Sequence, residues 1–152
     1  MDHTGRTVLV TGATGGIGTA VCRRLADAGL TLVLAARHET DLQQLCGSLP
    51  KNGSAPHTWI AVDMASDASV DAFAEELRRG AVVLDGVVLM PPQPHSTNEA
   101  LPSNQTWRDI FQTSFVGPLA LLKAAISTMR PTLPTVGDAR SSLSPACHLS
   151  RS

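Results

Sequence analysis

The sequence contains no tyrosine, few other aromatic residues and only three cysteines. Of its 152 residues, 3% are aromatic. The cysteines, Cys22, Cys46 and Cys147, lie far apart and form no C-x-x-C pair, so neither a disulfide framework nor a zinc knuckle is indicated. Reduced thiols are typical of cytoplasmic proteins, and we expect a cytoplasmic location.

Neither sign of charge is in excess, because 12 basic residues face 13 acidic ones and the net charge is -1. Such a chain has no broad positive field, so binding to nucleic acid or to an anionic membrane is not expected. No apolar run approaches the roughly 18 residues that a membrane span needs. The five histidines show no i, i+4 pairing, and no metal site is predicted. A small-molecule partner is the remaining expectation.

What the sequence does contain is a regular alternation of apolar β-branched runs and amphipathic segments. Strands are predicted at residues 7–10, 30–36, 57–62 and 84–90, and helices after residue 16 and at 39–49, 69–79 and 105–129. Short connections between them favour a parallel sheet with helices on both faces. The predicted fold class is α/β, a Rossmann-type sheet of about four strands in the order 3-2-1-4, which is an incomplete doubly wound fold. We expect one domain over residues 1–131 and an irregular tail over residues 132–152, where Pro, Ser, Thr and Arg dominate.

Apolar spacing indicates two of the helices, and the apolar stripe of the last one is expected to face the core. In the first, Ile17, Val21 and Leu25 recur four residues apart, and Gly29 is placed to end the helix. In the last, Trp107, Phe111 and Phe115 begin a stripe that continues to Met129. Pro118 is expected to kink this helix.

Glycines gather where the first strand meets its helix, in residues 11–18 (T-G-A-T-G-G-I-G). Gly12 permits a sharp turn, Gly16 lets the backbone approach a pyrophosphate, and Gly18 allows close packing of helix and strand. The backbone amides of such a turn then face the anion. The alternative is a glycine-rich turn that binds nothing.

This spacing resembles the T-G-x-x-x-G-I-G signature of the short-chain dehydrogenase/reductase family. The resemblance covers about residues 6–131. It implies a dinucleotide cofactor on this loop, held by Gly12, Thr14, Gly15, Gly16, Ile17 and Gly18.

The end of the second predicted strand indicates which dinucleotide binds. An acidic residue there would accept from the ribose 2′-hydroxyl and repel a 2′-phosphate, whereas this sequence has Arg37, whose guanidinium suits a phosphate. NADP(H) is therefore the predicted cofactor; the alternative is that Arg37 is one more solvated charge. Asp63, followed by Met64, matches the family's adenine-contacting aspartate, although an acidic helix cap is an equal alternative.

The resemblance weakens toward the active site. Residues 89–92 (L-M-P-P) stand where the family has Asn-Asn-Ala-Gly, and Ser114 stands at the position of its active-site asparagine. Family catalysis also uses a serine and a Tyr-x-x-x-Lys pair. This sequence has no tyrosine, and Lys123 has none four residues before it. We therefore assign no catalytic residue.

The predicted function is that of a short-chain dehydrogenase/reductase-like fragment that binds NADP(H). The parent reaction would be hydride transfer between NADP(H) and a carbonyl or alcohol. We expect the chain to be inactive alone, and the sequence does not indicate the substrate. Frameshift, alternative splicing or a premature stop near residue 131 would each explain the change in composition. The alternative function is a non-catalytic truncated product or an interaction module, which would self-associate through the exposed edge of the fourth strand.

Overall fold

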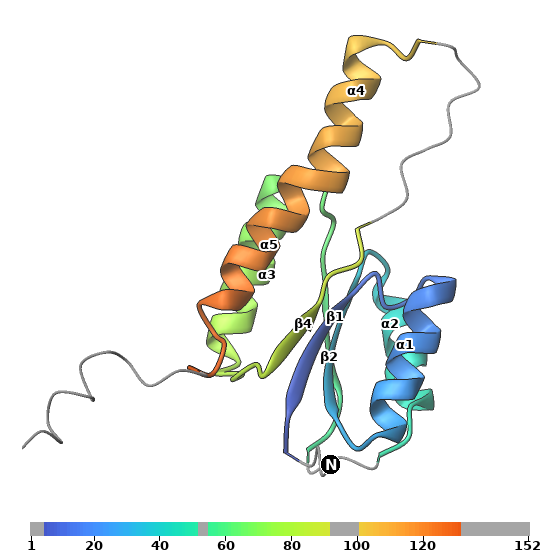
Figure 1. Ribbon diagram of the computed structural model, residues 1–152, viewed down its shortest axis with the longest axis vertical. Coiled ribbons are helices and arrows are strands. Elements are labelled where there is room, and N and C mark those ends of the chain that lie inside the picture. Colours follow the sequence, from blue (N-terminus) through green and yellow to red (C-terminus); the bar gives the residue numbers. More distant parts are fainter. Residues whose placement is uncertain (1–4, 52–54, 92–100, 132–152) are drawn as a thin grey trace, which may run out of the picture.

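The computed structural model describes residues 5–51, 55–91 and 101–131, and the predicted tail at 132–152 lies outside them. The described chain forms one parallel sheet of four strands in the order β3-β2-β1-β4, which confirms the predicted order (Figure 1). The strands are β1 (Thr7–Thr11), β2 (Thr31–Ala36), β3 (Thr58–Ala61) and β4 (Gly86–Val88). The helices are α1 (Gly16–Asp27), α2 (Glu39–Ser48), α3 (Asp67–Arg79), α4 (Asn104–Phe111), the π-helical turn η1 (Gln112–Val116) and α5 (Gly117–Ile126).

Helices cover both faces of this sheet. Figure 1 shows α1 and α2 on one side and α3 with α5 on the other. Each side has its own apolar core: Phe73 and Leu121 belong to the α3–α5 side, and Cys22 and Leu42 to the α1–α2 side. Every residue of β2 is buried, as expected for a central parallel strand read from an uninterrupted apolar run.

Helix α1 ends as predicted. Gly29 has a φ of +86°, and Leu30 N–H donates to Leu25 C=O, which is the pattern of a left-handed helix terminus. The buried positions are Gly18, Cys22 and Ala26. Leu25 packs against this core from a half-buried position and Ile17 is exposed, because Gly18 faces the turn after β1 and so fixes the rotation of the helix.

The long helix predicted at 105–129 is three segments. Pro118 has no N–H for the carbonyl of Ser114, and the chain widens just before it into η1, where Gly117 N–H donates to Gln112 C=O. Helix α4 then rises away from the sheet (Figure 1). The prediction that Trp107, Phe111 and Phe115 pack in the core is wrong, because all three are exposed, Phe111 by 60%.

Strand β4 is shorter than predicted, and the chain just before it is paired on its outer side. Leu84 N–H donates to Thr128 C=O, and Arg130 N–H donates to Leu84 C=O, so Met129 lies beside Leu84 in parallel. Asp85 strengthens this corner, since its carboxylate accepts from Thr7 N–H at 2.8 Å and lies 3.0 Å from Arg130 Nε. A wholly unpaired edge was predicted, and the structure corrects this at Leu84.

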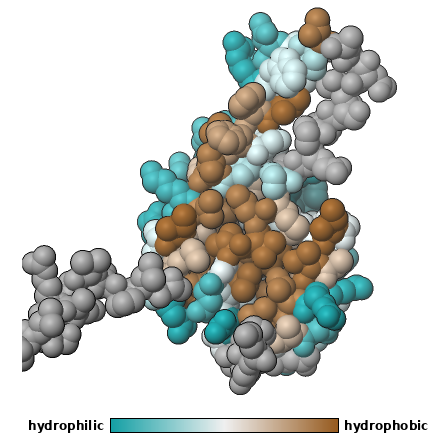
Figure 2. All heavy atoms as spheres, in the orientation of Figure 1, coloured by the Kyte–Doolittle hydropathy of each residue, from teal (hydrophilic) through white to brown (hydrophobic). Residues whose placement is uncertain are grey.

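Beyond Leu84, the described residues place no strand on the outer edge of β4, whose three residues are all half-buried. Figure 2 shows apolar surface over the part of the molecule around β4 and along α5. Ile126 and Leu119 are among the exposed apolar side chains of α5.

Candidate functional site

A cleft of about 840 Å³ opens at the carboxyl ends of the strands. It lies where the strand order reverses between β1 and β4, which is the usual ligand site of open α/β sheets. All nine residues predicted to hold a cofactor line it, and their binding role stays a prediction. They are Gly12, Thr14, Gly15, Gly16, Ile17, Gly18, Arg37, Asp63 and Met64.

The glycines of the loop divide into two kinds. Gly12 has a φ of +61°, and a Cβ there would lie 3.0 Å from the carbonyl oxygen of Met90. A Cβ on Gly18 would clash with the carbonyl oxygen of Gly12. By contrast, a Cβ on Gly16 would meet no protein atom within 4 Å. Gly12 and Gly18 are therefore required by the fold, whereas Gly16 leaves open space for a ligand.

The start of α1 carries backbone donors without partners in the helix. Thr19 N–H donates to Gly15 C=O at 2.8 Å, which is the first bond of the helix, so the amides of residues 16–18 precede the hydrogen-bond ladder. No side chain caps them, and no acidic residue lies in the first turn. Together with the helix dipole, this end favours an anion such as a pyrophosphate.

Thr11, at the end of β1, holds Met90, which follows β4 and lines the cleft. Its side chain is fully buried, and its hydroxyl accepts from Met90 N–H at 2.8 Å and lies 3.3 Å from Met90 C=O, to which it donates. This pair of contacts fixes residue 90 against the end of β1, beside the glycine loop.

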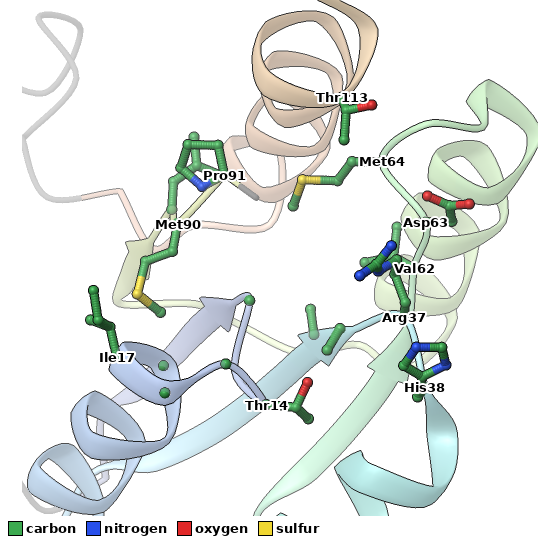
Figure 3. A pocket seen from close by; sticks show the side chains of 17 residues that line it. Thr14, Ile17, Arg37, His38, Val62, Asp63, Met64, Met90, Pro91 and Thr113 are labelled. Atoms are coloured by element: carbon green, nitrogen blue, oxygen red, sulfur yellow. The ribbon is translucent and has the colours of Figure 1, made fainter. Parts of the chain in front are cut away.

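The charged residues gather at one end of the cleft, where Figure 3 shows Arg37, His38 and Asp63 together. Arg37 follows β2 directly and is exposed. Asp63 accepts from Ala65 N–H at 3.0 Å within its own turn. The alternative of a helix cap is wrong, because Ser66 caps α3 by accepting from Ser69 N–H.

The opposite end of the cleft is apolar. Ile17, Met90 and Pro91 lie there, with Met64 between this end and the charged one (Figure 3). Ile17 is 74% exposed. The backbone of Met64 lies against Gly117, since a Cβ on Gly117 would clash with the carbonyl oxygen of Met64. Met90, Pro91 and Thr113 also line the cleft and were not predicted to do so. Thr113 had a usable signal, since it adjoins Ser114 at the family's active-site position.

Comparison with known proteins assigns this site to a family. Residues 6–136, most of the chain, match the family model described as short chain dehydrogenase. The chain belongs to the short-chain dehydrogenase family. The match continues a few residues past Pro131, where the resemblance was expected to end.

Individual relatives of this short-chain dehydrogenase agree with the assignment. The chain is 30% identical over 130 residues to sulfoacetaldehyde reductase 2 of Chromohalobacter salexigens, covering 82% of this chain and 49% of that protein. It is 31% identical over 141 residues to the human hydroxysteroid 11-beta-dehydrogenase 1-like protein, covering 91% and 42%. The chain thus spans less than half of the length of both relatives.

The fold is also found in a solved reductase structure. L-sorbose reductase from Gluconobacter frateurii, complexed with NADPH and L-sorbose, superposes with a TM-score of 0.74 at 24% identity, over 84% of this chain and 49% of that one. At this identity the likeness concerns the fold.

The departures from the family pattern lie around the apolar end of the cleft. Ser114, at the position of the family asparagine, lies in η1, and its buried Oγ has no hydrogen-bond partner among the described residues. Lys123 is exposed on α5 and does not line the cleft. None of the described residues supplies the family's tyrosine–lysine pair.

The thiols of Cys22 and Cys46, the cysteines among the described residues, do not line the cleft. Burial raises the pKa of the Cys22 thiol to about 11 and also raises the pKa of Cys46, so both stay protonated at neutral pH. Among residues 5–51, 55–91 and 101–131, no three acidic, histidine or cysteine side chains form a metal cluster. Within the same residues, no helix has the length and apolar character to cross a membrane.

Proposed function

We propose that the cleft binds NADP(H) and that the chain is the cofactor-binding portion of an oxidoreductase that transfers hydride between NADP(H) and a carbonyl or alcohol. The observation that carries the choice of NADP(H) is Arg37, which follows β2 at the charged end of the cleft. A guanidinium there attracts a ribose 2′-phosphate, and no carboxylate takes its place at the end of β2. The pyrophosphate would lie on the uncapped start of α1.

Exchanging Arg37 for aspartate tests this proposal. Titration of NADPH into the 152-residue chain, followed by nicotinamide fluorescence and calorimetry, is expected to show binding that is tighter than that of NADH. A charge-assisted hydrogen bond contributes about 1.5–3 kcal/mol, so Arg37→Asp should weaken NADPH binding at least about 10–100-fold and reverse the preference.

Arg79→Asp is the matched control, because Arg79 is exposed at the end of α3 and does not line the cleft. It should leave both affinities unchanged. An unmodified chain that prefers NAD(H) would refute the role of Arg37.

A second candidate, an interaction module, is supported by the edge of β4. Because Leu84 directs its N–H and C=O away from β1, alternation directs those of Gly86 and Val88 the same way. Such groups pair readily with strands of other chains, and self-association through this edge is proposed as the non-catalytic alternative. It requires no nucleotide, so concentration-dependent association without NADPH binding would favour it.

The cytoplasm is the proposed location of this protein. Cys22 and Cys46 are free thiols, and burial raises the pKa of both. Free thiols of this kind persist in a reducing compartment.

A further inference from the structure

At the end of the sheet opposite to the cleft, the side chain of His57 lies between three segments of the chain. Its Nδ1 is 3.1 Å from the backbone nitrogen of Leu32 in β2, and its Nε2 is 2.9 Å from the carbonyl oxygen of Pro50, which follows α2. The His57 carbonyl in turn accepts from the thiol of Cys46 in α2. One half-buried residue, directly before β3, thus connects β3 with both β2 and α2.

The two partners of the imidazole determine which of its nitrogens carries the hydrogen. A backbone N–H can only donate, so Nδ1 must present its lone pair to Leu32. A carbonyl oxygen can only accept, so Nε2 must carry the hydrogen that Pro50 receives. The neutral Nε2–H tautomer satisfies both contacts. A second proton, placed on Nδ1, would point at the N–H of Leu32 and abolish that hydrogen bond.

The N–H of Leu32 depends on this acceptor because it lies one step before the β2–β3 ladder. Even-numbered residues of β2 direct their backbone groups toward β3, since Val62 N–H donates to Ala36 C=O. The paired register of the two strands begins only at Val33 and Thr58. Leu32 is fully buried, so loss of the imidazole nitrogen leaves a buried donor unsatisfied, which is unfavourable.

The charged groups described around the imidazole do not favour a second proton. Among residues 5–51, 55–91 and 101–131, the ion pairs lie in α3 and beside β4, and none involves His57. On the α2 side, burial raises the pKa of the Cys46 thiol, which stays neutral, and Lys51 is positive. On the strand side, the neighbouring Leu32 and Thr58 carry no charge. Protonation of the imidazole would therefore gain no attraction from these neighbours.

We propose that His57 makes the joining of β3 to β2 sensitive to pH: the neutral imidazole holds β2, β3 and the end of α2 together, and its protonation separates them. Histidine is the side chain that ordinarily changes charge between neutral and mildly acidic pH. The unfolded chain binds the second proton freely, whereas the folded chain must break the bond to Leu32 to do so. Stability is therefore full above about pH 6.5 and falls below it, by a factor that approaches tenfold in the folding equilibrium constant per pH unit.

Urea denaturation of the 152-residue chain at about pH 7.5 and about pH 5.5 tests the proposal, because carboxylates, which titrate near pH 4, stay ionised over this range. The folding equilibrium constant is expected to fall about tenfold. His57→Asn should remove this dependence, since the amide oxygen of asparagine can accept from Leu32 N–H and does not titrate. His38→Gln is the matched control and should keep the dependence, because His38 is exposed and its side chain caps no helix.

Nuclear magnetic resonance of the unmodified chain gives a second readout that does not require a variant to fold. Near pH 7.5, the ring nitrogens of His57 should show the Nε2–H tautomer, and toward pH 5.5 the protection factor of the Leu32 amide against hydrogen exchange should fall about tenfold. A hydrogen on Nδ1 at about pH 7.5 would overturn the proposal. Equal pH dependence in the unmodified chain and His57→Asn, or its loss in His38→Gln, would overturn it as well.

Discussion

At the scale of the single residue, Thr11 has the most consequential contacts near the cleft. Replacing it with valine keeps the shape but leaves Met90 N–H and C=O without their partner. An unsatisfied buried group costs about 1–3 kcal/mol, and we expect Thr11→Val to lower the free energy of unfolding by this amount in urea denaturation. Thr58→Val, on an exposed position of β3, should change it by less than about 0.5 kcal/mol. Equal effects of the two variants would show that the hydrogen bonds of the Thr11 hydroxyl to Met90 do not stabilise the protein.

The sequence predicted which residues line the cleft better than it predicted the buried face of α1. The glycine spacing of residues 11–18 determines a turn whatever the surroundings, because steric limits on φ and Cβ act locally. The face that α1 buries depends instead on the close approach of Gly18 to the Gly12 carbonyl, a contact between the helix and the turn after β1. This is why the apolar spacing predicts the helix but not that Gly18, Cys22 and Ala26 form its buried face.

At the scale of the element, α5 is positioned by the contact of its first residue with the loop after β3. A methyl group on Gly117 would clash with the Met64 carbonyl, so Gly117→Ala should destabilise the protein by about 1–3 kcal/mol, the usual cost of overpacking. Gly47→Ala in α2 is the matched control. Its Cβ would meet no atom within 4 Å, and the higher helix propensity of alanine should stabilise by up to about 1 kcal/mol. Urea denaturation of both variants measures the difference, and a stabilising Gly117→Ala would contradict the packing described here.

The helical segment from α4 to α5 shows why amphipathic patterns are incomplete predictors. The spacing of Trp107, Phe111 and Phe115 correctly indicates that they share one side, and Phe111 and Phe115 do meet edge to face, with ring centroids 6.4 Å apart. Periodicity does not state whether another element covers that side. Here the buried side of α5 is Gly117, Pro118, Leu121 and Ala125, where small residues permit close approach.

At the scale of the whole molecule, the absence of tyrosine has a direct consequence for activity. Positioned acid–base groups typically accelerate a reaction by about 10²–10⁴-fold, and the 152-residue chain has no tyrosine to provide one. We expect no carbonyl-dependent oxidation of NADPH by the purified chain in absorbance assays at 340 nm. Turnover that disappears in Gly16→Trp, which fills the cleft, would contradict this expectation. Turnover that survives in that variant would come from contaminating reductases.

The strand order was predictable because alternating strands and helices with right-handed crossovers leave few arrangements of a parallel sheet. The pairing of Leu84 with Met129 was not predictable, since it joins segments distant in the sequence and depends on where α5 ends. Only the packing of α5 against α3 brings residues 128–130 to this corner, where Asp85 and Arg130 meet.

That corner is also the last part of the sheet to be completed during synthesis. The four strands lie within the first 88 residues, but the partner of Leu84 is Met129. A ribosome that adds about 5–20 residues per second needs roughly 2–9 seconds for the 45 or so residues between them. Throughout this interval the nascent sheet presents its whole outer edge to the surrounding proteins. A codon change that slows translation of residues 90–128 would therefore raise the yield of aggregated chains without altering a single amino acid.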